Sequence, residues 1–268
     1  MPDINHDQIR SAVRENYTKI SQGNSSSCCG ASSSCCETSA EDEAVKISAV
    51  LGYSKIELSA VPQGANLGLG CGNPQAIASL KPGEVVLDLG SGAGFDVFLA
   101  ARSVGEQGRV IGVDMTPSMV SKARQNLQRS SFTNVEFRLG EIEALPVADG
   151  IIDVIISNCV INLSPEKDKV FKEAFRVLKL GGRLAISDVV RTAELPEEVK
   201  SDLQLYSGCI SGASSILELE MMLKKAGFEQ VRIEPKDASK TFIKDWAPGS
   251  KVEDYVVSAS IEAVKPAY

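Results

Sequence analysis

"VVLDLGSGAGFDVFLAARSV" occupies residues 85–104 and has the pattern of a strand, a glycine loop and a helix in succession. Its first five residues are apolar except for Asp88, which is typical of a strand buried on both faces. Gly90, Gly92 and Gly94 follow, and glycines there allow a tight turn and let a ligand approach the backbone. A buried strand that turns through such a loop into a helix predicts a parallel α/β fold.

The flanking sequence repeats the same alternation. RVIGVD (109–114) predicts a second strand, and PSMVSKARQNLQ, which begins at Pro117, predicts the helix after it. Further strands are predicted at 135–139, 151–157 and 183–190, with a helix at 166–178. Residues 191–214 interrupt the pattern before a helix at 215–226 and strands at 228–235 and 254–264. We therefore predict a Rossmann-like, doubly wound and mostly parallel sheet.

Three regions are expected along the chain. Residues 1–72 hold a helix within 3–22, a Ser- and Cys-rich arm, a short helical pattern near 43–51 and a glycine-rich loop. Residues 73–190 form the predicted ligand-binding core, and residues 191–268 form a segment that covers the site and completes the sheet.

Composition narrows the classes of function. With 268 residues and 43% hydrophobic content, the chain is long enough to bury a substantial core. A net charge of −7 and the lack of a basic cluster with interleaved aromatic residues disfavour a nucleic-acid partner. No run of eighteen apolar residues occurs, and MPDINHDQIR at the start lacks a secretory pattern. We expect a cytoplasmic protein with no membrane partner.

Cysteine is the residue type most indicative of chemistry. In the reducing cytosol, an odd number of cysteines favours metal ligands or reactive groups over structural disulfides. Four of the seven lie within GNSSSCCGASSSCCETSAED (23–42), a polar arm; they are Cys28, Cys29, Cys35 and Cys36. Such an arm can capture a soft ligand through its thiols.

The other three cysteines lie at loop positions. Cys71 precedes a helix predicted to start near Asn73, and a helix N-terminus lowers the pKa of a thiol. Cys159 directly follows a predicted strand, where ligands of such sheets bind. Cys209 lies between Gly208 and Gly212, so we expect it to be mobile enough to approach the others. Each cysteine taken alone also fits a small buried hydrophobic residue.

The glycine loop indicates an adenosine ligand. Asp114 ends the next predicted strand, where a carboxylate can bind both ribose hydroxyls. A dinucleotide fingerprint needs a glycine at position 95, and this chain has Phe95. The spacing instead resembles motif I of class I S-adenosylmethionine methyltransferases. That resemblance implies cofactor contacts at Asp88, Gly90, Ser91, Gly92, Gly94, Asp114, Met115, Ile142 and Glu143.

Four stretches together resemble arsenite methyltransferases over nearly the whole chain. They are DLGSGAGFD, GCG before the first core helix, YSGCISGA, and the most distinctive one, SNCVINLSPEKDKVFKEAFRVLKLGGRLAISDV. The resemblance implies a trivalent arsenic site at Cys71, Cys159 and Cys209, a capturing cysteine within 28–36, and matching family positions at Tyr17 and Asn158, which we assign to the cofactor site.

The expected activity is therefore methylation of arsenite and methylarsenite by S-adenosylmethionine, as arsenic detoxification. An external thiol reductant, glutathione or thioredoxin, would restore the site. Because the single histidine, His6, is near the terminus, no histidine base is expected. Two alternatives stay open: methylation of a small organic acceptor such as a quinone, sterol or phenol, and thiol-rich metalloid sequestration without turnover. The arm lacks CxxC zinc spacing, which disfavours sequestration of zinc.

Overall fold

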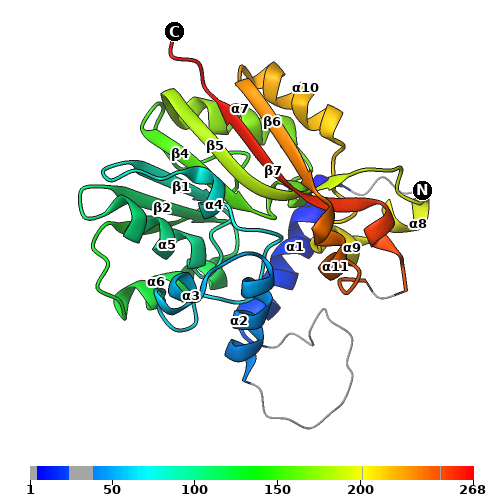
Figure 1. Ribbon diagram of the computed structural model, residues 1–268, viewed down its shortest axis with the longest axis horizontal. Helices are drawn as coiled ribbons and strands as arrows, with labels where there is room; N and C mark the ends of the chain where they lie inside the picture. Colours follow the sequence, from blue (N-terminus) through cyan, green and yellow to red (C-terminus); the bar gives the residue numbers. More distant parts are fainter. Residues whose placement is uncertain (1–4, 24–38, 201, 248) are drawn as a thin grey trace.

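A seven-stranded sheet forms the centre of the molecule in this computed structural model, which describes residues 5–23, 39–200, 202–247 and 249–268 (Figure 1). The strand order is β3-β2-β1-β4-β5-β7-β6, in which β7 is antiparallel to both of its neighbours and the other pairs are parallel. The strands are β1 Val85–Leu89, β2 Arg109–Asp114, β3 Val135–Leu139, β4 Ile152–Asn158, β5 Leu178–Arg191, β6 Glu229–Lys236 and β7 Val256–Val264. The predicted doubly wound, mostly parallel fold is confirmed.

Helices cover both faces of this sheet. One face packs against α7 and α10, and the other packs against α4, α5 and α6. The helices are α1 His6–Ser21, α2 Ala40–Val50, α3 Lys55–Ser59, α4 Gln75–Ala78, α5 Phe95–Val104, α6 Pro117–Gln128, α7 Lys167–Val177, α8 Glu197–Lys200, α9 Leu203–Ser207, α10 Ile216–Ala226 and α11 Lys240–Ile243. Strands β1 and β4 place side chains on both faces, as expected for strands buried between two helical layers.

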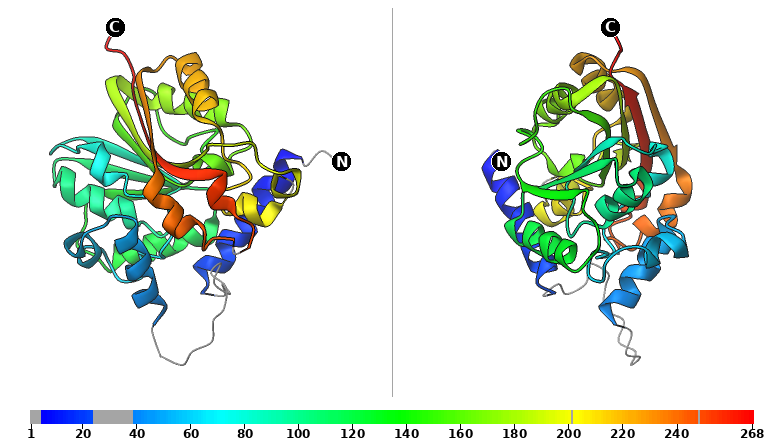
Figure 2. Two further views of the ribbon diagram at one scale, coloured as in Figure 1. Left: turned by 45° about the vertical axis from the view of Figure 1, so that its right-hand side comes forward. Right: turned by 90° about the vertical axis from the view of Figure 1, so that its left-hand side faces the viewer.

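A third apolar cluster lies at the carboxyl ends of the strands and contains all three described cysteines. Helix α1 supplies Ile9 and Val13 to it, and residues 195–213 supply a second wall. Helix α1 also contacts α6 and α9, and Figure 2 shows it running along the edge of the molecule beside α6. The N-terminal helix therefore covers the end of the sheet at which ligands of this fold bind.

The predicted boundaries differ from the structure at a few places. The predicted helix 166–178 ends at Val177, and β5 begins at Leu178 rather than at residue 183. The last strand begins at Val256 because residues 252–254 form a short 3₁₀ turn. Within the described ranges, no helix has the length and apolarity needed to cross a membrane. The division of the chain at residues 72 and 190 stays a prediction.

Candidate active site: three thiols beside a glycine loop

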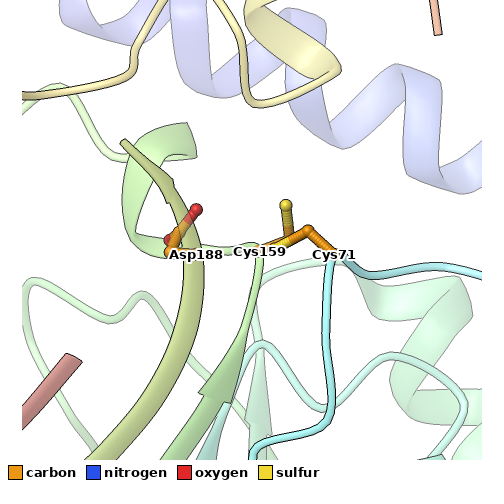
Figure 3. A group of neighbouring side chains, drawn as sticks. All are labelled: Cys71, Cys159 and Asp188. Atoms are coloured by element: carbon orange, nitrogen blue, oxygen red, sulfur yellow. The ribbon is translucent and has the colours of Figure 1, made fainter. Parts of the chain in front are cut away.

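Three buried thiols meet at the carboxyl ends of β4 and β5. Cys71 comes from the loop before α4, Cys159 follows β4, and Cys209 follows α9. All three are free, and at most 8% of each residue is exposed. The Sγ atoms of Cys71 and Cys159 and a carboxylate oxygen of Asp188 lie within 4.8 Å of one another (Figure 3). The Sγ of Cys209 donates to the carbonyl oxygen of Cys159 at 2.8 Å. Cys209 thus already lies against Cys159, without the approach expected from its glycine neighbours.

Two of these cysteines have an unusual backbone conformation. The φ angle is 59° at Cys159 and 65° at Cys209, in the left-handed region that favours glycine. For a residue with a side chain, this conformation costs about 1 to 2 kcal/mol of free energy. Such residues persist only where surrounding contacts hold them, and they gather at functional sites. The surroundings of both cysteines must therefore supply those contacts.

The prediction that a helix N-terminus lowers the pKa of Cys71 is wrong. Helix α4 spans only four residues, too short for a substantial dipole. Its N-cap is Pro74 rather than the predicted Asn73, whose side chain nevertheless accepts from the Ala76 N–H at 3.3 Å. Burial instead raises the pKa of the Cys71 thiol. Hydrogen bonds with Cys209 and Cys71 raise the pKa of Cys159 well above its ordinary value. The free site therefore contains protonated thiols at neutral pH.

Asn158, at the end of β4, holds the loop that carries Cys71. Its side-chain oxygen accepts from the Cys71 N–H at 3.0 Å, and its Nδ2 donates to the Gly72 carbonyl at 2.8 Å. The same Nδ2 lies 3.1 Å from the Tyr53 hydroxyl, which donates to Asp96 at 2.8 Å. Both the oxygen and the nitrogen of this amide group thus form hydrogen bonds within the protein, and these bonds position the Cys71 thiol. Its contact with the cofactor stays a prediction.

The three glycines of the loop after β1 have different surroundings. A Cβ at Gly90 would lie 2.4 Å from the Val160 side chain, and one at Gly94 would lie 2.7 Å from Phe137. At these two positions, glycine lets the side chains of Val160 and Phe137 pack directly against the loop backbone. A Cβ at Gly92 would meet nothing within 4 Å. The backbone at Gly92 therefore borders open space, where a ligand can approach it.

Three carboxylates surround this loop: Asp88 and Asp96 are buried, and Asp114 is partly buried. Asp114 accepts from the Gly92 N–H at 2.9 Å and from the Thr116 N–H at 2.8 Å, so it fixes the loop at the end of β2. Burial, then the charges of Asp96 and Asp114, raise the pKa of Asp88 well above its ordinary value. Among the described residues, no side-chain cation forms an ion pair with Asp88. A cationic ligand such as a sulfonium or an ammonium would complement this cradle.

The remaining predicted cofactor residues lie around the same end of the sheet. Ser91 turns its hydroxyl toward β2, where a Cβ at Gly112 would meet it at 2.7 Å. Met115 and Tyr17 pack against the thiol cluster. Burial, then the neighbouring Cys209 and Cys159, raise the pKa of Tyr17 well above its ordinary value. Ile142 packs in the core, and Glu143 accepts from the Ser164 hydroxyl at 2.6 Å and pairs with an arginine of α1.

Comparison with known proteins identifies the family to which the chain belongs. A model described as a methyltransferase domain matches residues 80–227. An arsenite methyltransferase of Halobacterium salinarum is 53% identical, over 99% of this chain and 68% of that protein. The chain belongs to the arsenite methyltransferase family. A second arsenite methyltransferase, from Aquipseudomonas alcaligenes, is 39% identical over 84% of this chain and 63% of that protein. The chain thus spans about two thirds of the length of these two relatives.

A solved arsenite methyltransferase structure has the same fold. It is an arsenic(III) S-adenosylmethionine methyltransferase from Chlamydomonas reinhardtii, with a TM-score of 0.60 and 33% identity over 83% of this chain and 73% of that chain. The fold is that of class I S-adenosylmethionine-dependent methyltransferases. The open backbone at Gly92 fits this cofactor, which carries both a sulfonium and an ammonium group, and so does Asp88, which has no cationic partner among the described residues.

Not every predicted residue of this arsenite methyltransferase family member can be placed. Cys28, Cys29, Cys35 and Cys36 lie outside the described residues, so their role stays a prediction. Conversely, sequence reasoning missed Asp188, Asn162 and Asp96, which are all buried near the site. Burial raises the pKa of Asp188 to about 6, and likewise that of Asp96. The available signal was a single acidic residue within an apolar segment: Asp188 in RLAISDVV and Asp96 in FDVFLA.

Proposed function

We propose that this protein methylates trivalent arsenic, which it holds through Cys71, Cys159 and Cys209, with S-adenosylmethionine as the methyl donor. The observation that carries the proposal is the meeting of three buried, free thiols at the carboxyl edge of the sheet that also holds the glycine loop. The names of the similar arsenite methyltransferases support arsenic as the substrate.

Arsenite suits a site of three protonated thiols. Trivalent arsenic is soft and prefers sulfur ligands, following the logic that pairs thiolates with soft metals. When As(OH)₃ reacts with three thiols, three As–S bonds form and each thiol proton leaves with a hydroxyl as water. No net charge is then added to the buried site, which avoids the cost of burying an unpaired charge. The bound arsenic keeps a lone pair on its open face, and this lone pair is the nucleophile.

The protein's task is to position and enclose the reactants. S-adenosylmethionine supplies an electrophilic methyl group bonded to a sulfonium. Gly92 would let the cofactor approach the backbone, Asp114, which fixes the loop, would bind the ribose, and Asp88 would offer its carboxyl group to the cationic portion. Tyr17 and the rest of α1 cover the thiols and exclude water. His6 is exposed on α1, consistent with a reaction that needs no histidine base.

The arm and the reductant belong to the same proposal. Cys28, Cys29, Cys35 and Cys36 capture arsenite and pass it by thiol exchange to Cys71. Attack by the lone pair forms an As–C bond, breaks the S–C bond of the methyl donor and formally oxidises arsenic to the pentavalent state. Glutathione or thioredoxin would supply the two electrons that return the site to free thiols, in the cytoplasm, where both are abundant. The biological role that follows is arsenic detoxification, with arsenite and methylarsenite as substrates.

Arsenic speciation tests the proposal. Purified protein is incubated with arsenite, S-adenosylmethionine and glutathione, and the products are separated and identified by mass spectrometry. We expect methylated arsenic, with one S-adenosylhomocysteine formed for each methyl group transferred. A parallel reaction with a hydroquinone in place of arsenite should yield neither product. S-adenosylhomocysteine formed only with the hydroquinone would favour an organic acceptor, and arsenite binding without any methylated product would favour sequestration.

A further inference from the structure

Cys159 needs a rigid support, since it has a side chain and a left-handed backbone. Its own N–H donates to the Ser187 carbonyl of β5 at 2.8 Å. The chain then continues through Val160 into a single 3₁₀ turn, Ile161–Leu163, which is buried. Strand β5 and this turn therefore determine where the Cys159 thiol points.

A single buried carboxylate fixes this turn to β5. Asp188 is 1% exposed, and its Oδ2 accepts from the backbone N–H groups of Ile161 at 2.9 Å and Asn162 at 3.4 Å. Its Oδ1 accepts from the side-chain Nδ2 of Asn162 at 2.9 Å and from the Val189 N–H at 2.7 Å. Hydrogen bonds to a charged acceptor are among the stronger ones in proteins.

Asn162 extends the same support to Cys209. Its Nδ2 also donates to the Val189 carbonyl at 2.6 Å, so both N–H bonds of this amide group are directed at β5. Its own carbonyl oxygen lies against Gly212, where an added Cβ would approach within 2.1 Å. Gly212 is three residues after Cys209, in the segment that holds that thiol against Cys159.

The same hydrogen bonds exclude a simpler role for Asp188. Its proximity to the Sγ atoms of Cys71 and Cys159 suggests a third ligand for a metal. A carboxylate offers about four lone-pair sites, and N–H groups of the protein already use all of them. The carboxylate is therefore saturated, and it acts on the backbone rather than on a bound ion.

We propose that Asp188 is a positioning residue that clamps the Ile161–Asn162 turn to β5 and so sets the separation of the Cys159 and Cys209 thiols. The inference rests on the proposed function, because a fixed separation matters only if both thiols bind the same arsenic atom. Two thiols at a fixed separation bind one arsenic far more tightly than either alone, since the second bond forms at high effective concentration.

The test compares a two-thiol probe with a one-thiol probe in the full-length chain. Cys28, Cys29, Cys35, Cys36 and Cys71 are replaced by serine in this parent chain, so that only Cys159 and Cys209 remain. Phenylarsine oxide reports chelation by both thiols, and N-ethylmaleimide reports each thiol singly. Asp188→Asn and Asp188→Ala should weaken phenylarsine oxide binding by about 100-fold. Alkylation by N-ethylmaleimide should be as fast as in the parent, or faster.

The matched control is Val154→Ala. Val154 is fully buried in β4, in a core cluster that contains no cysteine, so the substitution lowers stability without touching the clamp. It should retain phenylarsine oxide binding within about threefold of the parent, since distant sites act independently. Equal binding by the parent and the Asp188 variants would overturn the inference.

Hydrogen exchange in the unaltered protein gives a second, independent readout. The amide hydrogens of Ile161 and Asn162 should exchange as slowly as those of the β4 core, because both donate to the buried Asp188. Fast exchange at both amides would refute the clamp even if the Asp188 variants fail to fold. If the parent chain itself does not bind phenylarsine oxide, the proposed arsenic site fails, and the exchange data still decide whether the clamp exists.

Discussion

Arsenic chemistry at the level of single residues depends on how many bonds to sulfur the substrate can form. Arsenite can take three thiolates, whereas methylarsenite already carries one carbon and has two positions left. Cys159 and Cys209 are in direct contact, and Cys71 approaches from a separate loop. We therefore expect Cys159 and Cys209 to bind both substrates, and Cys71 to matter chiefly for arsenite.

Serine substitutions test this division. Cys159→Ser and Cys209→Ser should each abolish turnover of both substrates, because a hydroxyl is a hard, weak ligand for arsenic. Cys71→Ser should lower arsenite turnover on the order of 100-fold more than methylarsenite turnover, as one chelating bond is lost. Initial rates at saturating cofactor and excess glutathione measure the effect, with circular dichroism to verify folding. An equal fractional loss on both substrates in the Cys71 variant would refute the division.

Gly92 is where backbone should meet the cofactor. Gly92→Val should weaken S-adenosylmethionine binding by about 10- to 100-fold, because the side chain fills space beside an amide held by Asp114. Arsenite binding should be retained. Gly105→Val is the matched control, since Gly105 also has a positive φ and open space around it but caps the far end of α5. Calorimetry that finds the same cofactor affinity in both variants would contradict the assignment.

Asp96 should make stability depend on pH. Its folded pKa is raised to about 6 by burial, so the folded state holds a proton that the unfolded state has released. The free energy of unfolding therefore falls as pH rises from about 4 to about 6. Asp96→Asn removes this pH-dependent loss, and it also removes a negative charge that faces Asp88. Between pH 4 and pH 6, the free energy of unfolding of the variant should therefore rise by about 2 to 3 kcal/mol relative to that of the wild type.

Urea unfolding at pH 4, 5, 6 and 7 measures this difference. Asp245→Asn, at an exposed position, removes the same charge and serves as the control. A stability difference between Asp96→Asn and wild type that stays constant with pH would show that the carboxyl group ionises normally when folded.

Among the elements, α1 closes the site through arginines. Arg10 is 13% exposed at its side chain, and its Nη2 lies 2.6 Å from Glu166 and 3.3 Å from Glu143. Arg10 also lies 3.7 Å from Asp7 and 3.8 Å from Glu141. Arg14 is more exposed and, among the residues that the structure describes, pairs with Glu141 alone, at 3.3 Å. A shielded arginine with several carboxylate partners should anchor a helix better than a solvated pair.

Arginine substitutions should separate these two contacts. Arg10→Ala should cost about 1 to 3 kcal/mol of α1 docking, whereas Arg14→Ala should cost about 0.5 kcal/mol or less. Hydrogen exchange measures docking directly: α1 amides should exchange faster in Arg10→Ala, while the amides of β1 and β4 stay protected. Similar exchange in the two variants would mean that apolar contacts of Ile9 and Val13 hold the helix instead.

Elements with uniform, buried surroundings were predicted well from sequence. The bounds of β1, β2 and β3 were correct, because each is a short run that ends at glycine or a charged residue. Strand β5 was predicted to begin at residue 183, since Gly181 and Gly182 resemble a loop. In the structure, Leu178 pairs with Ile152 and the register shifts before Val154, so tertiary pairing overrides the local signal.

The site was predictable as to residue types but not as to their environment. The resemblance to arsenite methyltransferases implied that Cys71, Cys159 and Cys209 form one site, and their loop or strand-end positions agreed with that prediction. The pKa of Cys71 was predicted in the wrong direction, because burial is a tertiary property. Asp188 was missed since its four hydrogen-bond donors come from its own neighbour and from a turn 26 residues earlier.

At the scale of the whole molecule, the glycine loop and the three described thiols lie at the same carboxyl end of the sheet. The glycine loop follows β1, Cys159 follows the adjacent β4, and Asp188 lies on β5 beyond it. Helix α1 reaches this edge from the other end of the chain and supplies Tyr17 to the same cluster. Under the proposed function, this arrangement of adjacent strands would place the arsenic nucleophile and the methyl group side by side beneath α1.

X-ray absorption at the arsenic edge tests the central claim most directly. The sample is the full chain with Cys28, Cys29, Cys35 and Cys36 replaced by serine, loaded with one arsenite, so that Cys71, Cys159 and Cys209 are the only thiols. We predict three sulfur neighbours and no oxygen around arsenic, and two sulfurs when Cys209 is also replaced by serine. Arsenic that keeps its oxygen neighbours in the three-thiol chain would contradict the account.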